Sequence, residues 1–130
     1  MIVIDENIIE SQRQQLLQRR LRVRQIGFEV GRKGMDDRDQ IVPLLHQLNR
    51  VTFFTRDDDF YLRELCHPQY CLVVLAAPKD QVANLIVQTI RHRDFNTQRK
   101  QLGRVLRVSS TGIRFWRSTN ASEQVRRWAD

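Results

Sequence analysis

The order of apolar and polar positions along the chain predicts alternating strands and helices. Apolar runs at residues 2–4, 51–55 and 71–77 are typical of strands that are buried on both faces of a sheet. Between these runs, at residues 9–21, 41–48 and 82–90, apolar side chains recur every three or four positions, as on a helix with one buried face. A weaker pattern predicts a further short strand near residues 25–30.

The segment "VLRVSSTGIRFWR", residues 105–117, predicts a β-hairpin, because two alternating halves flank a glycine-bearing turn. Strands that alternate with helices imply a mainly parallel sheet with right-handed crossovers and helices on both faces. We therefore expect residues 1–130 to form one α/β domain of three layers that ends in this hairpin, with about ten irregular residues after it. In such a sheet, the ligand is expected outside the carboxyl ends of the strands.

Length and composition agree with one ordinary globular domain. The chain has 130 residues, of which 41% are hydrophobic and 28% are charged. It contains no apolar run near the roughly 20 residues of a membrane span, and "MIVIDENIIES" lacks the features of a signal peptide. We therefore expect a cytoplasmic protein that does not enter a membrane and whose Cys66 and Cys71 are free thiols. A zinc site at Cys66, His67 and Cys71 is weakly supported, because no second ligand pair is present.

The positive net charge limits the kinds of molecule that the protein is expected to bind. The net charge is +7, and only three of the 22 basic residues are lysines, so the other 19 are arginines. The planar guanidinium group suits paired hydrogen bonds to phosphate, and such an arginine excess is typical of proteins that contact nucleic acid. A solvated basic surface, or a basic face that docks an acidic protein, is the alternative interpretation.

Eight of the fifteen acidic residues fall into three short groups: Asp5 and Glu6; Asp36, Asp37 and Asp39; Asp57, Asp58 and Asp59. The first group immediately follows the first predicted strand and the third follows the central one, so the two groups should meet at one edge of a parallel sheet. Carboxylates that meet there repel one another unless a pKa rises or a divalent cation binds. Oxygen ligands favour Mg²⁺ or Mn²⁺, which would activate water for attack on a phosphodiester held by arginines.

Each acid also has a simpler interpretation. Asp39 would serve as the N-cap of a helix that begins near Gln40, and Asp58 would point into solvent. Asp5 and Glu6 would then be the polar end of a strand.

Three motifs resemble the PIN-like domain nucleases, in particular the branch related to VapC-type toxins. They are "IVIDEN" at residues 2–7, "GMDDRDQIVPLL" at residues 34–45 and "FFTRDDDF" at residues 53–60. PIN domains similarly have an aspartate after the first strand, an acid at the second helix, and a T-x-D/N motif followed by Asp-Phe. The order and spacing are similar over about the first 75 residues, and the strand and helix at residues 71–90 continue the likeness.

The resemblance implies a Mg²⁺- or Mn²⁺-dependent endoribonuclease that acts on RNA without a covalent intermediate. It also implies the toxin of a toxin–antitoxin pair, with an antitoxin protein as partner, and a homodimer. Asp5, Asp57 and Asp59 are similar to the metal ligands of that family, and Thr55 to the hydroxyl that orients them. The acid at the second helix is Asp37 or Asp39, and we prefer Asp39; Glu6 is a lesser candidate. RNA phosphates are expected at some of the arginines: Arg13, Arg19, Arg20, Arg32 and Arg56.

Two other classes of function compete with a nuclease. One is a non-catalytic module of the same fold that binds nucleic acid or a protein. The other is a receiver domain that accepts a phosphoryl group on aspartate, although Lys79 follows Pro78 rather than preceding it, and the arginine excess does not suit that class. A glycine-rich phosphate loop is absent from the sequence, and His46, His67 and His92 lack the arrangement of a nucleophile–base pair.

Overall fold

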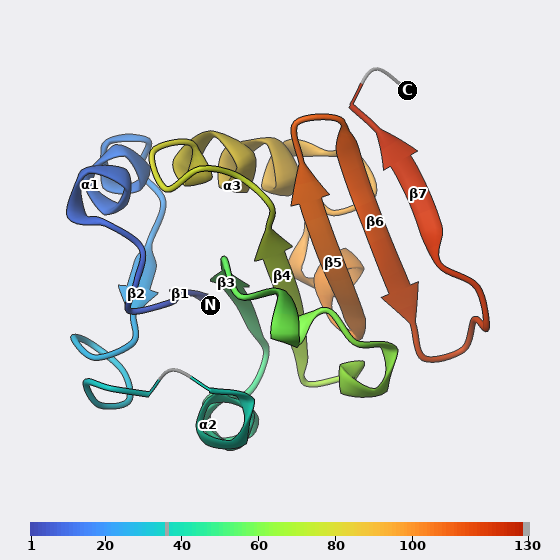
Figure 1. The fold of residues 1–130 in the computed structure, drawn as a ribbon, viewed down its shortest axis with the longest axis horizontal. Helices are drawn as coiled ribbons and strands as arrows, with labels where there is room; N and C mark the ends of the chain where they lie inside the picture. Colours follow the sequence, from blue (N-terminus) through green and yellow to red (C-terminus); the bar gives the residue numbers. More distant parts are fainter. Residues whose placement is uncertain (36, 129–130) are drawn as a thin grey trace.

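A computed structural model describes residues 1–35 and 37–128. Its seven described strands form one sheet in the order β2-β1-β3-β4-β5-β6-β7 (Figure 1). The strands β1 to β5 pair in parallel, β6 pairs antiparallel with β5, and β7 pairs antiparallel with β6. The predicted α/β fold with a mostly parallel sheet is therefore confirmed. The strands are β1 (Ile2–Ile4), β2 (Val23–Gln25), β3 (Val51–Thr55), β4 (Tyr70–Leu75), β5 (Arg104–Ser109), β6 (Gly112–Arg117) and β7 (Gln124–Arg127).

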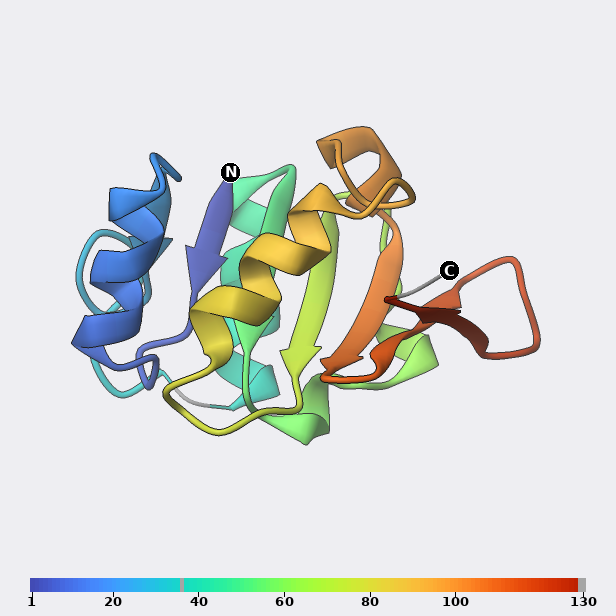
Figure 2. The same ribbon diagram turned by 90° about the horizontal axis from the view of Figure 1, so that it is seen from above.

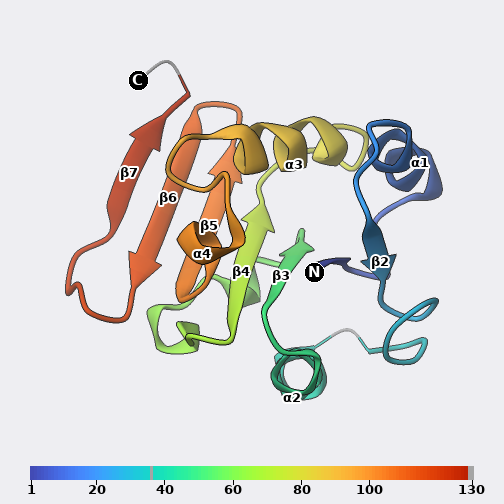
Figure 3. The same cartoon turned by 180° about the vertical axis from the view of Figure 1, so that it is seen from behind.

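Helices cover both faces of the sheet. The helices α1 (Glu10–Gln18) and α3 (Val82–Arg91) share one face, and α2 (Arg38–Leu48) covers the other (Figure 2). The short α4 (Gln98–Gln101) lies on the α3 side, before β5 (Figure 3). Two single 3₁₀ turns, η1 (Asp58–Phe60) and η2 (Arg63–Leu65), connect β3 to β4. None of the helices in the described part of the chain is long and apolar enough to cross a membrane.

The central strands explain the apolar runs in the sequence. All five residues of β3 and all six of β4 are buried. Successive side chains of a strand point to opposite faces, so Phe53 lies in the core under α2 while Phe54 lies in the core under α1 and α3. These strands are therefore mostly apolar, as the sequence predicted for strands that are buried on both faces, and Thr52 and Thr55 are the buried polar residues of β3.

The order of the strands reverses between β1 and β3. From β1 the chain runs through α1 to β2 on one side, and from β2 it crosses through α2 to β3 on the other side. Ile2 consequently pairs with both Val23 and Thr52. In Figure 2 the arrowheads of β1, β4 and β5 all point towards the lower side, so the loops that follow them lie along one edge. In open α/β sheets, ligands bind in the crevice at such a reversal.

Several element boundaries differ from the predictions. The second strand is Val23–Gln25 rather than residues 25–30, because Ile26 and Val30 enter the core from a turn instead of a strand. The predicted hairpin is present as β5 and β6, but β7 and the four-residue α4 were not predicted. The sequence of β7, "QVRR", has one apolar residue, Val125, and that side chain is 51% exposed. Its pairing with β6 therefore leaves no hydrophobic signature.

Candidate functional site

Asp5 directly follows β1 at the point where the strand order reverses. Its backbone N–H donates to the carbonyl of Phe54 at 3.0 Å, which continues the pairing of β1 with β3 by one residue. Its own carbonyl accepts from the backbone of Ile8 and from Nε2 of Gln25, both at 3.1 Å. The residue is 4% exposed. The backbone on both sides thus fixes an acidic side chain in the interior.

The carboxylate of Asp5 is only half satisfied. Its Oδ2 accepts a hydrogen bond of 2.7 Å from Oγ1 of Thr55. Its Oδ1 is buried and has no hydrogen-bond partner within residues 1–35 and 37–128. Burial raises the pKa of Asp5 above its ordinary value. The hydrogen bond from Thr55 and the nearby backbone N–H groups of Glu6 and Asn7 oppose this rise, and the charge of Asp57 adds to it. A buried acceptor without a partner needs an explanation, and a bound cation is one.

Thr55, the last residue of β3, connects the two acids. It is fully buried, its hydroxyl donates to Asp5, and the same oxygen accepts from the backbone N–H of Asp57 at 3.1 Å. Asp57 is half-buried, and its Oδ1 accepts from the backbone N–H of Asp59 at 2.9 Å. The ends of β1 and β3 are therefore joined through one hydroxyl group.

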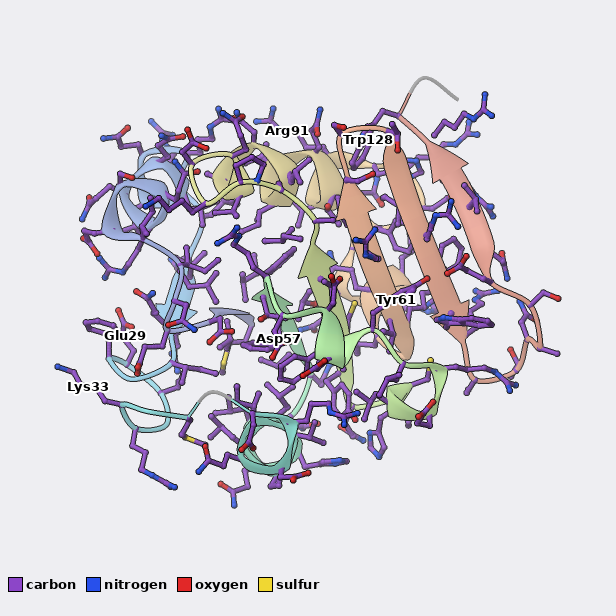
Figure 4. The ribbon with its side chains drawn as sticks, viewed as in Figure 1. Glu29, Lys33, Asp57, Tyr61, Arg91 and Trp128 are labelled. Carbon is purple, nitrogen blue, oxygen red and sulfur yellow. The ribbon has the colours of Figure 1, made fainter. Side chains whose placement is uncertain are left out.

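The two acids line a common cleft of about 330 Å³ together with Asn7, Ile8 and Arg56. The guanidinium group of Arg56 is held by a 3.0 Å hydrogen bond from its Nε to the carbonyl of Ala77, after β4. Figure 4 shows Asp57 near the middle of the molecule, on the side that faces the viewer. Two carboxylates, one carboxamide and one guanidinium group thus surround a single opening.

The acids at the second helix lie outside the set that lines this cleft. The helix α2 begins at Arg38, and its N-cap is Asp37, whose Oδ1 accepts from the backbone N–H of Gln40 at 3.1 Å. The prediction that Asp39 caps this helix was therefore wrong; Asp39 is exposed in the first turn. Asp36 lies outside the described residues.

The remaining acids have other contacts. Asp59 is exposed and contributes its backbone N–H to Asp57, but it does not line the cleft. Asp58 forms an ion pair of 3.0 Å with Arg107, so it does not simply point into solvent. Both carboxylate oxygens of Glu6 accept from the backbone N–H of Gly34 at 3.1 Å, which ties the loop after β1 to the loop before α2.

The donor set of the cleft fits a hard cation. Among the residues that the structure describes, no group of three or more His, Cys, Asp or Glu side chains is arranged to hold a metal ion. Two carboxylates line the cleft, those of Asp5 and Asp57, and these are the side chains that could bind a cation there. Magnesium sites commonly use one or two carboxylates and complete the coordination with water and substrate phosphate. The unpartnered Oδ1 of Asp5 is the atom that such an ion would satisfy.

Gln25 is a supporting residue that the sequence did not reveal. It ends β2, is 2% exposed, and its Nε2 lies 3.1, 3.2 and 2.9 Å from the carbonyl oxygens of Asp5, Glu6 and Ile8. It thereby holds the loop after β1 in place. A glutamine at the end of a short strand gives no signal of this role, because the contact depends on tertiary structure.

The predicted RNA-binding arginines do not gather at the cleft. Arg56 lines it, whereas Arg13 pairs with Glu10 and Glu29, both at 3.1 Å. Arg20 follows α1 and precedes β2, so it lies at the amino ends of the parallel strands, opposite the cleft. Arg32 is exposed in the loop before α2, and Arg19 donates to Asn84.

Both cysteines are free thiols, with Cys71 buried and Cys66 half-buried.

Comparison with protein-family models, with curated proteins and with solved structures returned no match. The likeness to PIN-like nucleases consequently stays a prediction from the three sequence motifs, and the chemistry of the cleft is argued from its own residues.

Proposed function

We propose that this protein is a divalent-metal-dependent endoribonuclease of the PIN-like type, with Mg²⁺ or Mn²⁺ held by Asp5 and Asp57. One observation supports the proposal above the others. A buried carboxylate oxygen without a partner lies beside a second carboxylate, at the point where the strand order reverses. A cation would remove both the unsatisfied acceptor and the repulsion between the two acids.

Thr55 and Arg56 each have a definite part in this proposal. Thr55 occupies Oδ2 of Asp5 and so directs Oδ1 towards the ion. Arg56 lines the same opening and binds a non-bridging phosphate oxygen, where it stabilises the negative charge that develops during attack by water. A bound cation would polarise the phosphodiester and lower the pKa of the attacking water.

Three further acids lie at the same edge of the sheet, although none of them lines the cleft, and they are candidates for outer positions around the ion. Asp59 lies on η1, two residues after Asp57. Asp37 and Asp39 lie at the start of α2, which follows the carboxyl end of β2 and so begins at the same edge of the sheet as the cleft. The resemblance extends the proposal to the toxin of a toxin–antitoxin pair, with an antitoxin and a second copy of this chain as partners.

Cleavage of a mixed RNA pool tests the proposal. The wild-type protein is assayed with Mn²⁺ and with EDTA, beside Asp5→Asn, Asp57→Asn and Glu64→Gln. Glu64 is an exposed carboxylate on η2 that does not line the cleft, so it is the matched control. We expect cleavage only with the ion, losses on the order of 100-fold or more in the two aspartate variants, and full activity in the control.

A non-catalytic module that binds nucleic acid is the second candidate. It is favoured by the finding that, of the acids in the described residues, only two line the cleft. Equal cleavage by wild type and Asp5→Asn would contradict the nuclease. RNA binding without any ion-dependent cleavage would support the non-catalytic module instead.

A further inference from the structure

The three C-terminal strands present an arginine-rich surface on the same side of the sheet as α2. The side chains of Arg107 on β5, Arg114 on β6 and Arg127 on β7 lie there; we call these three residues the arginine face. Arg107 is directly opposite Arg114 in the register, Arg114 is opposite Val125, and Arg127 follows Val125 by two residues. Paired residues, and residues two apart, share one face of a sheet.

Like charges that lie directly opposite each other destabilise a sheet. Each of the two paired arginines has one acidic contact, Arg107 with Asp58 at 3.0 Å and Arg114 with Glu123 at 3.1 Å. The side chains of Arg107 and Asp58 are 37% and 66% exposed, and those of Arg114 and Glu123 are 60% and 27% exposed. Ion pairs that water reaches easily contribute little to stability. A phosphate group can therefore replace Asp58 at small cost, whereas Glu123 is also held by a hydrogen bond from the hydroxyl of Tyr61.

The arginine face lines a cleft of about 630 Å³ together with the turn between β5 and β6. Ser110 and Thr111 in this turn bring hydroxyl groups, which commonly bind phosphate oxygens beside arginine. Trp128 also borders the cleft, but its indole packs on the other face of the sheet, where its ring centroid lies 6.1 Å from that of His92. The arginine face therefore offers guanidinium and hydroxyl groups, which suit the phosphates of a nucleic-acid backbone.

This second cleft adjoins the one at Asp5. Asp57 lines the first cleft, and the next residue, Asp58, pairs with Arg107 of the second. Both clefts include residues at the carboxyl ends of parallel strands, and three strand spacings of about 4.8 Å separate β3 from β6, or on the order of 14 Å. In Figure 4, Tyr61 lies over β5, between Asp57 and β7.

We propose that the arginine face binds the sugar–phosphate backbone of a single-stranded RNA and leads that strand to the cleft of Asp5 and Asp57. The second part of this inference rests on the proposed nuclease function. The first part does not, because backbone binding requires neither the ion nor cleavage.

The test measures binding of a fluorescein-labelled oligouridine by anisotropy in EDTA over a series of salt concentrations. The variant Arg107→Gln/Arg114→Gln/Arg127→Gln removes the arginine face. The matched control, Arg22→Gln/Arg24→Gln/Arg99→Gln, removes the same charge from three exposed arginines away from the arginine face, two around β2 and one on α4. Three lost phosphate contacts predict affinity about 100-fold weaker at 0.1 M salt, and a log–log salt slope smaller by about 2. The control should stay within about threefold of wild type.

Three results would overturn the inference. They are equal losses in the two variants, unchanged affinity and slope in the arginine-face variant, and equally tight binding of a poly-glutamate peptide, which would indicate an acidic protein partner. Replacing the same three residues by lysine keeps the charge and should restore most of the affinity, which excludes misfolding as the cause. Binding that depends on the arginine face in a protein without cleavage would support the RNA surface and contradict only the nuclease.

Discussion

Replacement of Asp5 by asparagine should stabilise the protein when divalent cations are absent. Burial raises the pKa of Asp5 in the folded protein, so between the unfolded value of 3.8 and the raised value the folded state binds more protons than the unfolded state. The stability contributed by Asp5 therefore falls as the pH rises through this window, and the deficit is complete above it. Asparagine carries no charge and has no such dependence.

The size of the effect follows from the contacts of the carboxylate. A buried polar group without a partner costs about 1–3 kcal/mol, and more when it is charged. In the variant, the amide oxygen still accepts from Thr55, and the repulsion from Asp57 disappears, but the amide nitrogen takes the place of the unpartnered oxygen. We expect a net gain of about 1 kcal/mol at pH 8, or roughly 3–5 °C in Tm for a domain of this size.

Circular dichroism during thermal unfolding in EDTA, from about pH 4, near the unfolded pKa of Asp5, to about pH 8, measures this effect. The stability difference between variant and wild type should grow with pH, and Glu64→Gln should show no such growth. Added Mn²⁺ should raise the Tm of the wild type and leave that of Asp5→Asn unchanged, because an ion that binds only the folded state stabilises it. A variant less stable than wild type at pH 8, or a difference independent of pH, would refute the reasoning.

Three other substitutions test the supports of the two clefts. Thr55→Val removes the hydroxyl between Asp5 and the backbone after β3 and should lower the free energy of unfolding by about 1–3 kcal/mol, measured with urea; an unchanged midpoint would contradict this. Gln25→Leu removes the side-chain N–H donor to three backbone carbonyls and should lower the free energy of unfolding by a similar amount. Hydrogen exchange in residues 5–8 should become faster; unchanged slow exchange there would show that the loop after β1 does not depend on Gln25. Gly112→Ala would place Cβ 2.1 Å from the carbonyl oxygen of Arg126, so it should destabilise the pairing of β6 with β7 by about 1–3 kcal/mol and expose residues 124–127 to exchange, whereas full protection would contradict the register.

The elements that the sequence predicted best are the central strands, which are buried on both faces of the sheet. The runs at β3 and β4 are mostly apolar because a central strand packs against helices on both faces. The bounds of β3 were predicted to the residue, whereas β4 was predicted as residues 71–77 and is Tyr70–Leu75. The edge strand β7 was missed because it is held by backbone hydrogen bonds to β6, which any sequence can form. The turn at residues 26–30 was mistaken for a strand because both place apolar side chains in the core.

The candidate site was predictable only in part. Asp5 and Asp57 follow neighbouring parallel strands, so topology alone brings them to one edge, and the structure places both in one cleft. The position of an acid in the loop before a helix depends on the path of that loop, and the structure places Asp37 at the N-cap of α2 and Asp39 in its exposed first turn. The contact of Gln25 with the loop after β1, and the pairing of Asp58 with Arg107, also depend on tertiary structure.

Anomalous scattering from a crystal of the protein grown with Mn²⁺ shows whether Asp5 and Asp57 share an ion. We expect a peak about 2.1 Å from Oδ1 of Asp5 and at a similar distance from a carboxylate oxygen of Asp57. Ordered manganese elsewhere in the same crystal, with none between these two side chains, would contradict this expectation.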